Sequence, residues 1–185
     1  MTQQQQPRIG IVIGSTREGR FGEKPAHWIH EIAKQRTDLA FELIDLRDHP
    51  LPFFNEPRSP AYGPVNNEAA RLWAGKLATL DGLIVVTPEY NHGPSAARAV
   101  EQLRLIAIEL QMAPVAHAVH IGMVESLGIM QQGKTFEDFP HLAQAANRLL
   151  DDMSWWTKVL KPAREGMTTG VAGREQRGQA VTVTA

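Results

Sequence analysis

The stretch Arg8–Gly22, which reads Arg-Ile-Gly-Ile-Val-Ile-Gly-Ser-Thr-Arg-Glu-Gly-Arg-Phe-Gly, decides the fold. Its first part, Arg8–Gly14, is a short β-branched run bounded by glycine, which predicts a buried strand. Its second part, Ser15–Gly22, is polar and contains two further glycines. The following segment, Pro25–Lys34, has apolar residues at helical spacing. The order of these three parts predicts a strand, a tight loop and a helix.

Strands and helices alternate along the rest of the sequence. We expect strands at Phe41–Leu46, Gly82–Thr87 and Val115–Ile121, helices at Asn67–Leu80, Ser95–Met112 and Phe139–Leu160, and a loop at Asp48–Pro64. Such alternation predicts an α/β fold, with a parallel sheet covered by helices on both faces and right-handed crossovers. Ligands of such sheets bind at the carboxyl ends of the strands, where the loops after the first and third strands meet.

The length of 185 residues suits one domain with flexible ends. We expect residues 1–7 to be a flexible N-terminus, residues 8–162 to form the domain, and residues 163–185 to be a mobile tail. The first seven residues lack the apolar region of a secretory signal. No apolar run approaches the length of a membrane span, so we expect no membrane partner.

Composition excludes several classes of function. The sequence contains no cysteine, which rules out disulfides, thiolate metal sites and cysteine nucleophiles. A net charge of −1 gives no overall field that would attract nucleic acid or an anionic membrane. The seven histidines show no spacing typical of metal ligands, so no metal site is expected. A Gly-x-Ser-x-Gly motif is absent, which leaves a serine hydrolase unsupported.

The loop after the first predicted strand has the chemistry of a phosphate site. A loop that enters a helix offers free backbone N–H groups and the positive end of the helix dipole. Ser15 and Thr16 add hydroxyl donors, and Arg17 and Arg20 add charged, fork-shaped donors suited to phosphate oxygens. The spacing is neither a Walker motif nor Gly-x-Gly-x-x-Gly, so a single terminal phosphate fits better than a triphosphate or pyrophosphate. The alternative is a solvated arginine-containing turn with a helix-capping hydroxyl.

The loop after the third predicted strand, Pro88–Pro94, is short and polar and contains one aromatic residue. Tyr90 can lie against a flat ring, and Asn91 can hydrogen-bond to the polar edge of such a ring. Glu89 can accept hydrogen bonds from sugar-like hydroxyls or can cap the next helix. For the two prolines of this loop, turn geometry alone is the competing explanation.

Together, the two loops resemble the NADPH-dependent FMN reductase family, which includes azoreductases, chromate reductases and quinone reductases. The matching segments are Gly14-Ser15-Thr16-Arg17 with Arg20, and Thr87-Pro88-Glu89-Tyr90-Asn91-His92. The likeness covers about residues 8–162 and includes Arg98–Arg104 and the helix with Trp155-Trp156. It implies a flavodoxin-like, doubly wound, three-layer α/β/α fold that holds FMN non-covalently.

The resemblance also implies which residues bind the cofactor. The phosphate of FMN would be bound by Ser15, Thr16, Arg17 and Arg20, its ribityl chain and ring by Pro88, Glu89, Tyr90 and Asn91, and Phe21 and Gly22 complete the expected set. We name no catalytic side chain, because the flavin itself carries the chemistry.

The activity implied by the resemblance is transfer of hydride or electrons from NADPH or NADH, through FMN, to a small acceptor. The acceptors of the family are quinones, azo compounds, metal oxyanions and free flavin. The absence of cysteine fits a cytoplasmic protein, and the family resemblance further implies a homodimer or homotetramer.

The sequence departs from the family pattern near Ala96–Arg98. One helix and one strand of the family, together about 30 residues, have no counterpart there. We therefore expect four strands where the family has five, with phosphate binding retained. Two alternatives follow: a shortened, non-catalytic relative that binds flavin or another phosphate ligand, and a phosphate-binding domain of a different class, such as a sugar-phosphate or nucleotide binder.

Overall fold

The centre of the protein is a three-stranded parallel sheet with the strand order β2-β1-β3. The computed structural model describes residues 6–91 and 94–170 of the chain. The strands are β1 (Arg8–Ile13), β2 (Ala40–Asp45) and β3 (Gly82–Val86). Each starts and ends within one residue of the range that the sequence predicts. In the sheet, Ile11 of β1 lies between Leu43 of β2 and Ile84 of β3.

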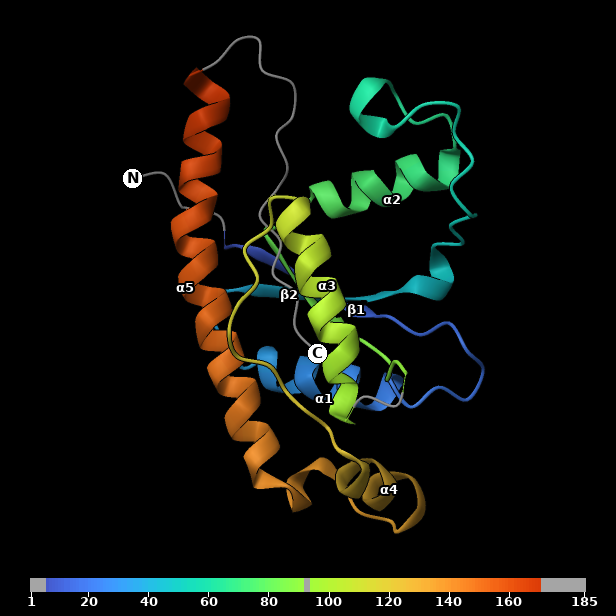
Figure 1. The fold of residues 1–185 in the computed structure, drawn as a ribbon. Helices are drawn as coiled ribbons and strands as arrows, with labels where there is room; N and C mark the ends of the chain where they lie inside the picture. The colour runs from blue at the N-terminus through green and yellow to red at the C-terminus, as the bar shows by residue number, and fades with distance from the viewer. Residues whose placement is uncertain (1–5, 92–93, 171–185) are drawn as a thin grey trace.

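Helices cover both faces of this sheet (Figure 1). The chain runs from β1 through α1 (Glu23–Ala33) to β2, and from β2 through α2 (Glu68–Ala78) to β3. These two crossovers lead in opposite directions across β1, so two right-handed crossovers place α1 and α2 on opposite faces. Helix α2 begins where the side chain of Asn67 accepts a hydrogen bond from the N–H of Ala70. The α/β/α architecture predicted from the sequence is therefore confirmed.

Two apolar clusters lie on the two faces. The larger packs β1 and α1 against α5 (Pro140–Gly170). Its most deeply buried members include Ile9, Ile11, Ala26, Leu142, Ala146, Leu149, Leu150 and Met153. The smaller packs Val12, Ile44, Leu80 and Leu83 under Trp73 and Leu77 of α2. The larger cluster thus depends on a helix that lies far from the sheet in the sequence.

Helix α5 is longer than the sequence predicts. It continues through Pro162 to Gly170, ten residues beyond the expected end at Leu160. Lys161 and Arg164 on the extension both pair with Asp81, whose carboxylate also accepts the N–H of Arg8. The tail expected at residues 163–185 therefore begins inside a helix, and residues 171–185 lie outside the described residues.

The predicted fourth strand is wrong. Val115–Ile121 is not part of the sheet, and β3 has a strand partner on one side only within the described residues. The carbonyls of Val115 and Ala116 accept hydrogen bonds from the Arg104 guanidinium at 3.1 and 3.0 Å. The apolar side chains that predicted a strand are still buried, because Val115 and Val119 belong to the larger cluster.

The segment between residues 94 and 139 contains two helices and short 3₁₀ turns. Helix α3 (Ala97–Glu109) follows a 3₁₀ turn at Pro94–Ala96. Ile106 and Leu110 of this helix are exposed, while Val100 and Ala107 are buried. Helix α4 (Met123–Gln131) was not predicted. None of the helices in the described part of the chain is long and apolar enough to cross a membrane.

The remaining 3₁₀ turns lie at Leu46–Asp48, Pro60–Tyr62 and Phe136–Asp138. The first follows β2 directly, and the side chain of Asp45 accepts a hydrogen bond from the N–H of Arg47 at 2.9 Å. This cap fixes the position of Arg47 at the carboxyl end of the sheet, beside the loop that follows β1.

Candidate functional site

The loop Gly14–Gly22 connects β1 to α1 at the carboxyl edge of the sheet. Gly14 donates its N–H to the carbonyl of Val86 at 2.9 Å, which ties the loop to the end of β3. A Cβ at Gly14 would lie 2.8 Å from that same oxygen, so the position requires glycine. Gly19 has a φ of +63°, a second place where the turn favours glycine. The loops after β1 and β3 therefore start from one anchored point.

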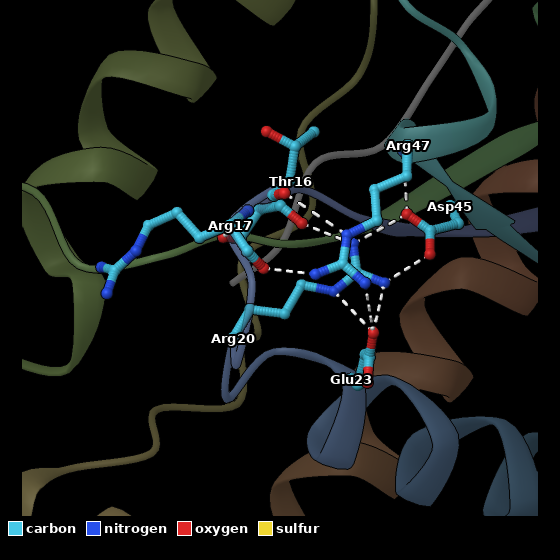
Figure 2. A network of polar contacts seen from close by, with 7 residues as sticks. Thr16, Arg17, Arg20, Glu23, Asp45 and Arg47 are labelled. Atoms are coloured by element: carbon cyan, nitrogen blue, oxygen red, sulfur yellow. Dashed lines mark hydrogen bonds and ion pairs between the residues drawn. The ribbon is translucent and has the colours of Figure 1, made fainter.

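Arg20 is at the centre of a polar network (Figure 2). Its side chain is only 2% exposed, and its guanidinium donates to both oxygens of Asp45, with Nη1 to Oδ1 at 2.7 Å. It also donates to Glu23 Oε1 at 2.7 and 2.9 Å and to the carbonyl of Ser15 at 2.5 Å. The hydrogen bond with Arg20 lowers the pKa of Asp45 to about 2. The same bond raises the pKa of Arg20.

These contacts give Arg20 a role that the sequence did not predict. All of its nitrogens donate to carboxylate or carbonyl oxygens of the protein, and moving them to a phosphate would leave the partly buried carboxylate of Asp45 without its cation. In the described structure Arg20 therefore supports the loop, and its contact with a phosphate stays a prediction. The sequence alone could not show this support, because the main anionic partner of Arg20, Asp45, is 25 residues away in the chain.

Arg47 completes the network from the 3₁₀ turn after β2. Its Nε donates to the carbonyl of Thr16 at 3.3 Å, and its Nη2 donates to the carbonyl of Arg17. Its Nη1 donates to Glu23 at 3.1 Å. Two arginines and two carboxylates thus brace the loop from the side of β2 and α1.

Arg17 differs from its neighbours. Its guanidinium has no hydrogen-bond or ion-pair partner among residues 6–91 and 94–170, and Figure 2 shows its side chain pointing away from the network. Arg17 lines a cavity of about 370 Å³ beside the loop. A cation without a protein partner at the edge of a cavity is available to an anionic ligand.

The cavity lies between the two loops that the sequence singled out. It is lined by Ser15, Arg17, Gly19, Arg20, Phe21, Gly22 and Pro25, by Val86, Thr87, Pro88 and Glu89, and by Ser95, Ala96, Val119, Ile121, Ser126 and Met130. Its volume is in the range typical of small-molecule sites. The structure therefore brings together seven of the ten expected cofactor-binding residues.

The other three expected residues lie outside the lining. Thr16 is exposed, and its carbonyl faces Arg47. Tyr90 is 59% exposed. Asn91 has a φ of +52°, and its carbonyl accepts a hydrogen bond from Arg98. The next two residues, His92 and Gly93, lie outside the described part of the chain.

One wall of the cavity was not predicted from the sequence. Val119, Ile121, Ser126 and Met130 come from the extended segment before α4 and from α4 itself. The expected strand at Val115–Ile121 placed two of these residues inside a sheet. A short helix after Gly122 was detectable only from Met123, Leu127 and Met130 at helical spacing, a weak signal over nine residues.

The lining residues fit a ligand with one anionic end and one flat apolar part. The anionic end matches Arg17, Ser15 and backbone N–H groups of the loop. Val86, Ile121 and Met130 supply apolar surface, and Glu89 supplies an acceptor for hydroxyl groups. FMN has this combination of a phosphate, a hydroxylated chain and a flat ring, so the residues present fit the cofactor.

Comparison with known proteins agrees with the fit of these lining residues to FMN. Residues 7–97 match the model of the NADPH-dependent FMN reductase family. An NAD(P)H-dependent FMN reductase of Schizosaccharomyces pombe is 37% identical over 89 residues, which cover 47% of this chain and 44% of that protein. An NAD(P)H-dependent FMN reductase of Nectria sp is 35% identical over 92 residues, 46% of each chain. A 2-hydroxy-1,4-benzoquinone reductase of Burkholderia sp is 34% identical over 84 residues, 45% of this chain and 42% of that protein.

The similarity is confined to part of the molecule. The matched region contains both predicted loops and all three strands, and it ends where α3 begins. The aligned part spans slightly less than half the length of each of these relatives. The wall formed by Val119–Met130 lies beyond the match.

Proposed function

From the match of residues 7–97 to the model of the NADPH-dependent FMN reductase family, we propose that this protein binds FMN in the cavity between its two loops and acts as an NAD(P)H-dependent oxidoreductase. The observation that carries the proposal is the guanidinium of Arg17, which has no partner among the described residues and lines a cavity bounded by both loops of the family match. When bound, FMN supplies hydride and electron transfer between a nicotinamide and an acceptor.

The protein's own residues would bind and orient the cofactor. Arg17 and Ser15 would hold the phosphate, assisted by the N–H groups of the loop. Pro88 and Glu89 would lie along the hydroxylated chain, and Val86, Ile121 and Met130 would contact the ring. No side chain is assigned a proton-transfer role.

For the acceptor, we propose a small quinone. The support is the similarity to a protein named as a 2-hydroxy-1,4-benzoquinone reductase. Azo compounds, metal oxyanions and free flavin are further candidates through the family resemblance. The cytoplasmic location and the homodimer or homotetramer stay predictions.

The experiment for cofactor binding is a visible absorption spectrum of the purified protein, before and after incubation with FMN and removal of the free cofactor. We expect bound FMN to give the yellow flavin bands. A protein that stays colourless, and that does not quench FMN fluorescence in a titration, would refute the proposal.

A second candidate function is binding of flavin without turnover. It is favoured by the end of the family match at residue 97 and by the sheet of three strands in the described structure. The two functions are separated by following NADPH and NADH oxidation at 340 nm with the FMN-loaded protein and a benzoquinone. Acceptor-dependent oxidation supports the reductase, and stable FMN binding with no oxidation supports the non-catalytic relative.

A further inference from the structure

Three consecutive carbonyl groups in the loop after β1 accept hydrogen bonds from guanidinium groups on one side. The Ser15 carbonyl accepts from Arg20 at 2.5 Å, the Thr16 carbonyl accepts from Arg47 at 3.3 Å, and the Arg17 carbonyl accepts from Arg47. Figure 2 shows both guanidiniums on the same side of the loop. One side chain, Arg47, therefore holds two of the three carbonyls.

This arrangement fixes the direction of the backbone N–H groups. In a trans peptide, the carbonyl of one residue and the N–H of the next point in opposite directions. The N–H groups of Thr16, Arg17 and Glu18 consequently point away from Arg20 and Arg47. Arg17 N–H has only a long contact of 3.4 Å with Ser15 Oγ. Successive N–H groups on one side of a turn form a concave site for an anion.

We propose that Arg47 is a positioning residue for the phosphate site, one that holds the backbone of Thr16 and Arg17 with its N–H groups directed at the ligand. This inference rests on the proposed function, because it assumes that a phosphate-bearing ligand occupies the cavity. Arg47 is not among the residues that line the cavity, so it would act through the loop and not by contact.

The position of Arg47 is itself fixed by the network. Its N–H is capped by Asp45, and its Nη1 donates to Glu23, the first residue of α1. Asp45 and Glu23 also bind Arg20. The end of β2, the start of α1 and the loop therefore form one rigid unit, which removes freedom that a mobile loop would lose on binding phosphate.

The test compares two ligands that differ only in the phosphate. Dissociation constants for FMN and riboflavin are measured by fluorescence titration on the full chain and on Arg47→Ala, Arg47→Lys and Arg148→Ala. Without Arg47 the loop N–H groups would lose their fixed direction, which would cost about one hydrogen bond to the phosphate. We therefore expect Arg47→Ala to weaken FMN binding about tenfold and to leave riboflavin binding unchanged. Arg148→Ala is the charge-matched control, because this exposed arginine of α5 does not line the cavity.

Arg47→Lys separates positioning from charge. Lysine keeps the positive charge but cannot donate in parallel to two carbonyls as the planar guanidinium does. We expect it to lose nearly as much FMN affinity as the alanine variant. Circular dichroism and thermal unfolding of each variant check that the fold is retained.

The outcomes distinguish this inference from the proposed function. Unchanged FMN affinity in Arg47→Ala, full affinity in Arg47→Lys, or an equal loss for FMN and riboflavin would each overturn the positioning role while FMN binding stands. An unaltered protein that binds neither flavin would overturn both. A selective loss of FMN affinity in both Arg47 variants, absent in Arg148→Ala, supports the inference.

Discussion

Arg17 and Arg20 lie three residues apart in one loop and have the same chemistry, yet the structure gives them different surroundings. Arg20 is buried against Asp45 and Glu23, so its charge is already neutralised by the protein. Arg17 is exposed at the cavity and has no partner within the described part of the chain. A guanidinium that must first break two ion pairs binds a ligand poorly, which leaves Arg17 as the side chain to test.

Replacing Arg17 by alanine should weaken FMN binding by about 1.5–3 kcal/mol, the value of a hydrogen bond to a charged group. The fold should be unaffected, since the guanidinium has no hydrogen-bond or ion-pair partner in the described part of the chain. Isothermal titration calorimetry with FMN measures the effect, and Arg148→Ala controls for net charge. Equal affinities of the two variants would show that Arg17 is only a solvated turn residue.

Replacing Asp45 by asparagine should destabilise the fold at neutral pH. The change leaves the guanidinium of Arg20 buried without its main anion, which we expect to lower the free energy of unfolding by about 2 kcal/mol. This loss of stability is smaller than for a fully buried ion pair, because the Asp45 side chain is 25% exposed. Urea unfolding followed by circular dichroism provides the measurement.

The same pair predicts how this difference depends on pH. The pKa of Asp45 is lowered to about 2 in the folded protein, so the carboxylate stabilises the fold above its ordinary pKa of about 4. The stability gap between the unaltered protein and Asp45→Asn should narrow as the pH falls from about 4 toward 2. Glu31→Gln, at an exposed pair with Lys34, should show no comparable gap at any pH.

The next prediction concerns α4, which lies outside the region that matches the family model. Met130 lines the cavity and is 49% exposed, whereas Met123 on the same helix is 75% exposed and does not line it. Met130→Glu should weaken FMN and riboflavin binding alike, because a carboxylate would face the apolar part of either ligand. Met123→Glu places the same charge outside the cavity and should bind as the unaltered protein does. Parallel behaviour of the two variants would place the ring away from α4.

Some elements of the fold can be predicted from the sequence and others cannot, and the reasons are physical. Strands β1 and β3 were predictable because both have continuous apolar runs that are bounded by glycine or polar residues. Val115–Ile121 also contains apolar residues, but these can be buried without forming a strand, and the carbonyls of Val115 and Ala116 accept hydrogen bonds from Arg104. The exposed apolar residues of α3 show the same ambiguity. Helical periodicity predicts an apolar face, but it does not predict which element packs against that face. The positions of Arg20 and Arg47 depend on hydrogen bonds to Asp45 at the end of β2, and a local sequence pattern cannot reveal the contact between Arg20 and Asp45.

The match to the family model ends at residue 97, but the hydrophobic core of the protein includes residues on both sides of this point. Residues 7–97 contain the sheet, α1 and α2, and both loops of the candidate site. The face of β1 that carries Ile9 and Ile11 is covered by α1 together with α5, which begins at Pro140. Leu142, Leu149 and Leu150 of α5 are at most 1% exposed. The part that resembles the family therefore relies on a helix outside the match.

A chain cut after residue 97 should consequently fail to fold, although it retains every residue of the family match. Burial of each large apolar side chain of α5 contributes about 1.5–3 kcal/mol, and several of them together equal the whole stability of a typical domain. Circular dichroism during thermal unfolding should show a cooperative transition for residues 1–185 and none for residues 1–97. A sharp transition in the short chain would mean that α1 and α2 suffice to cover the sheet. In that case α5 would serve the protein in some way other than by completing its core.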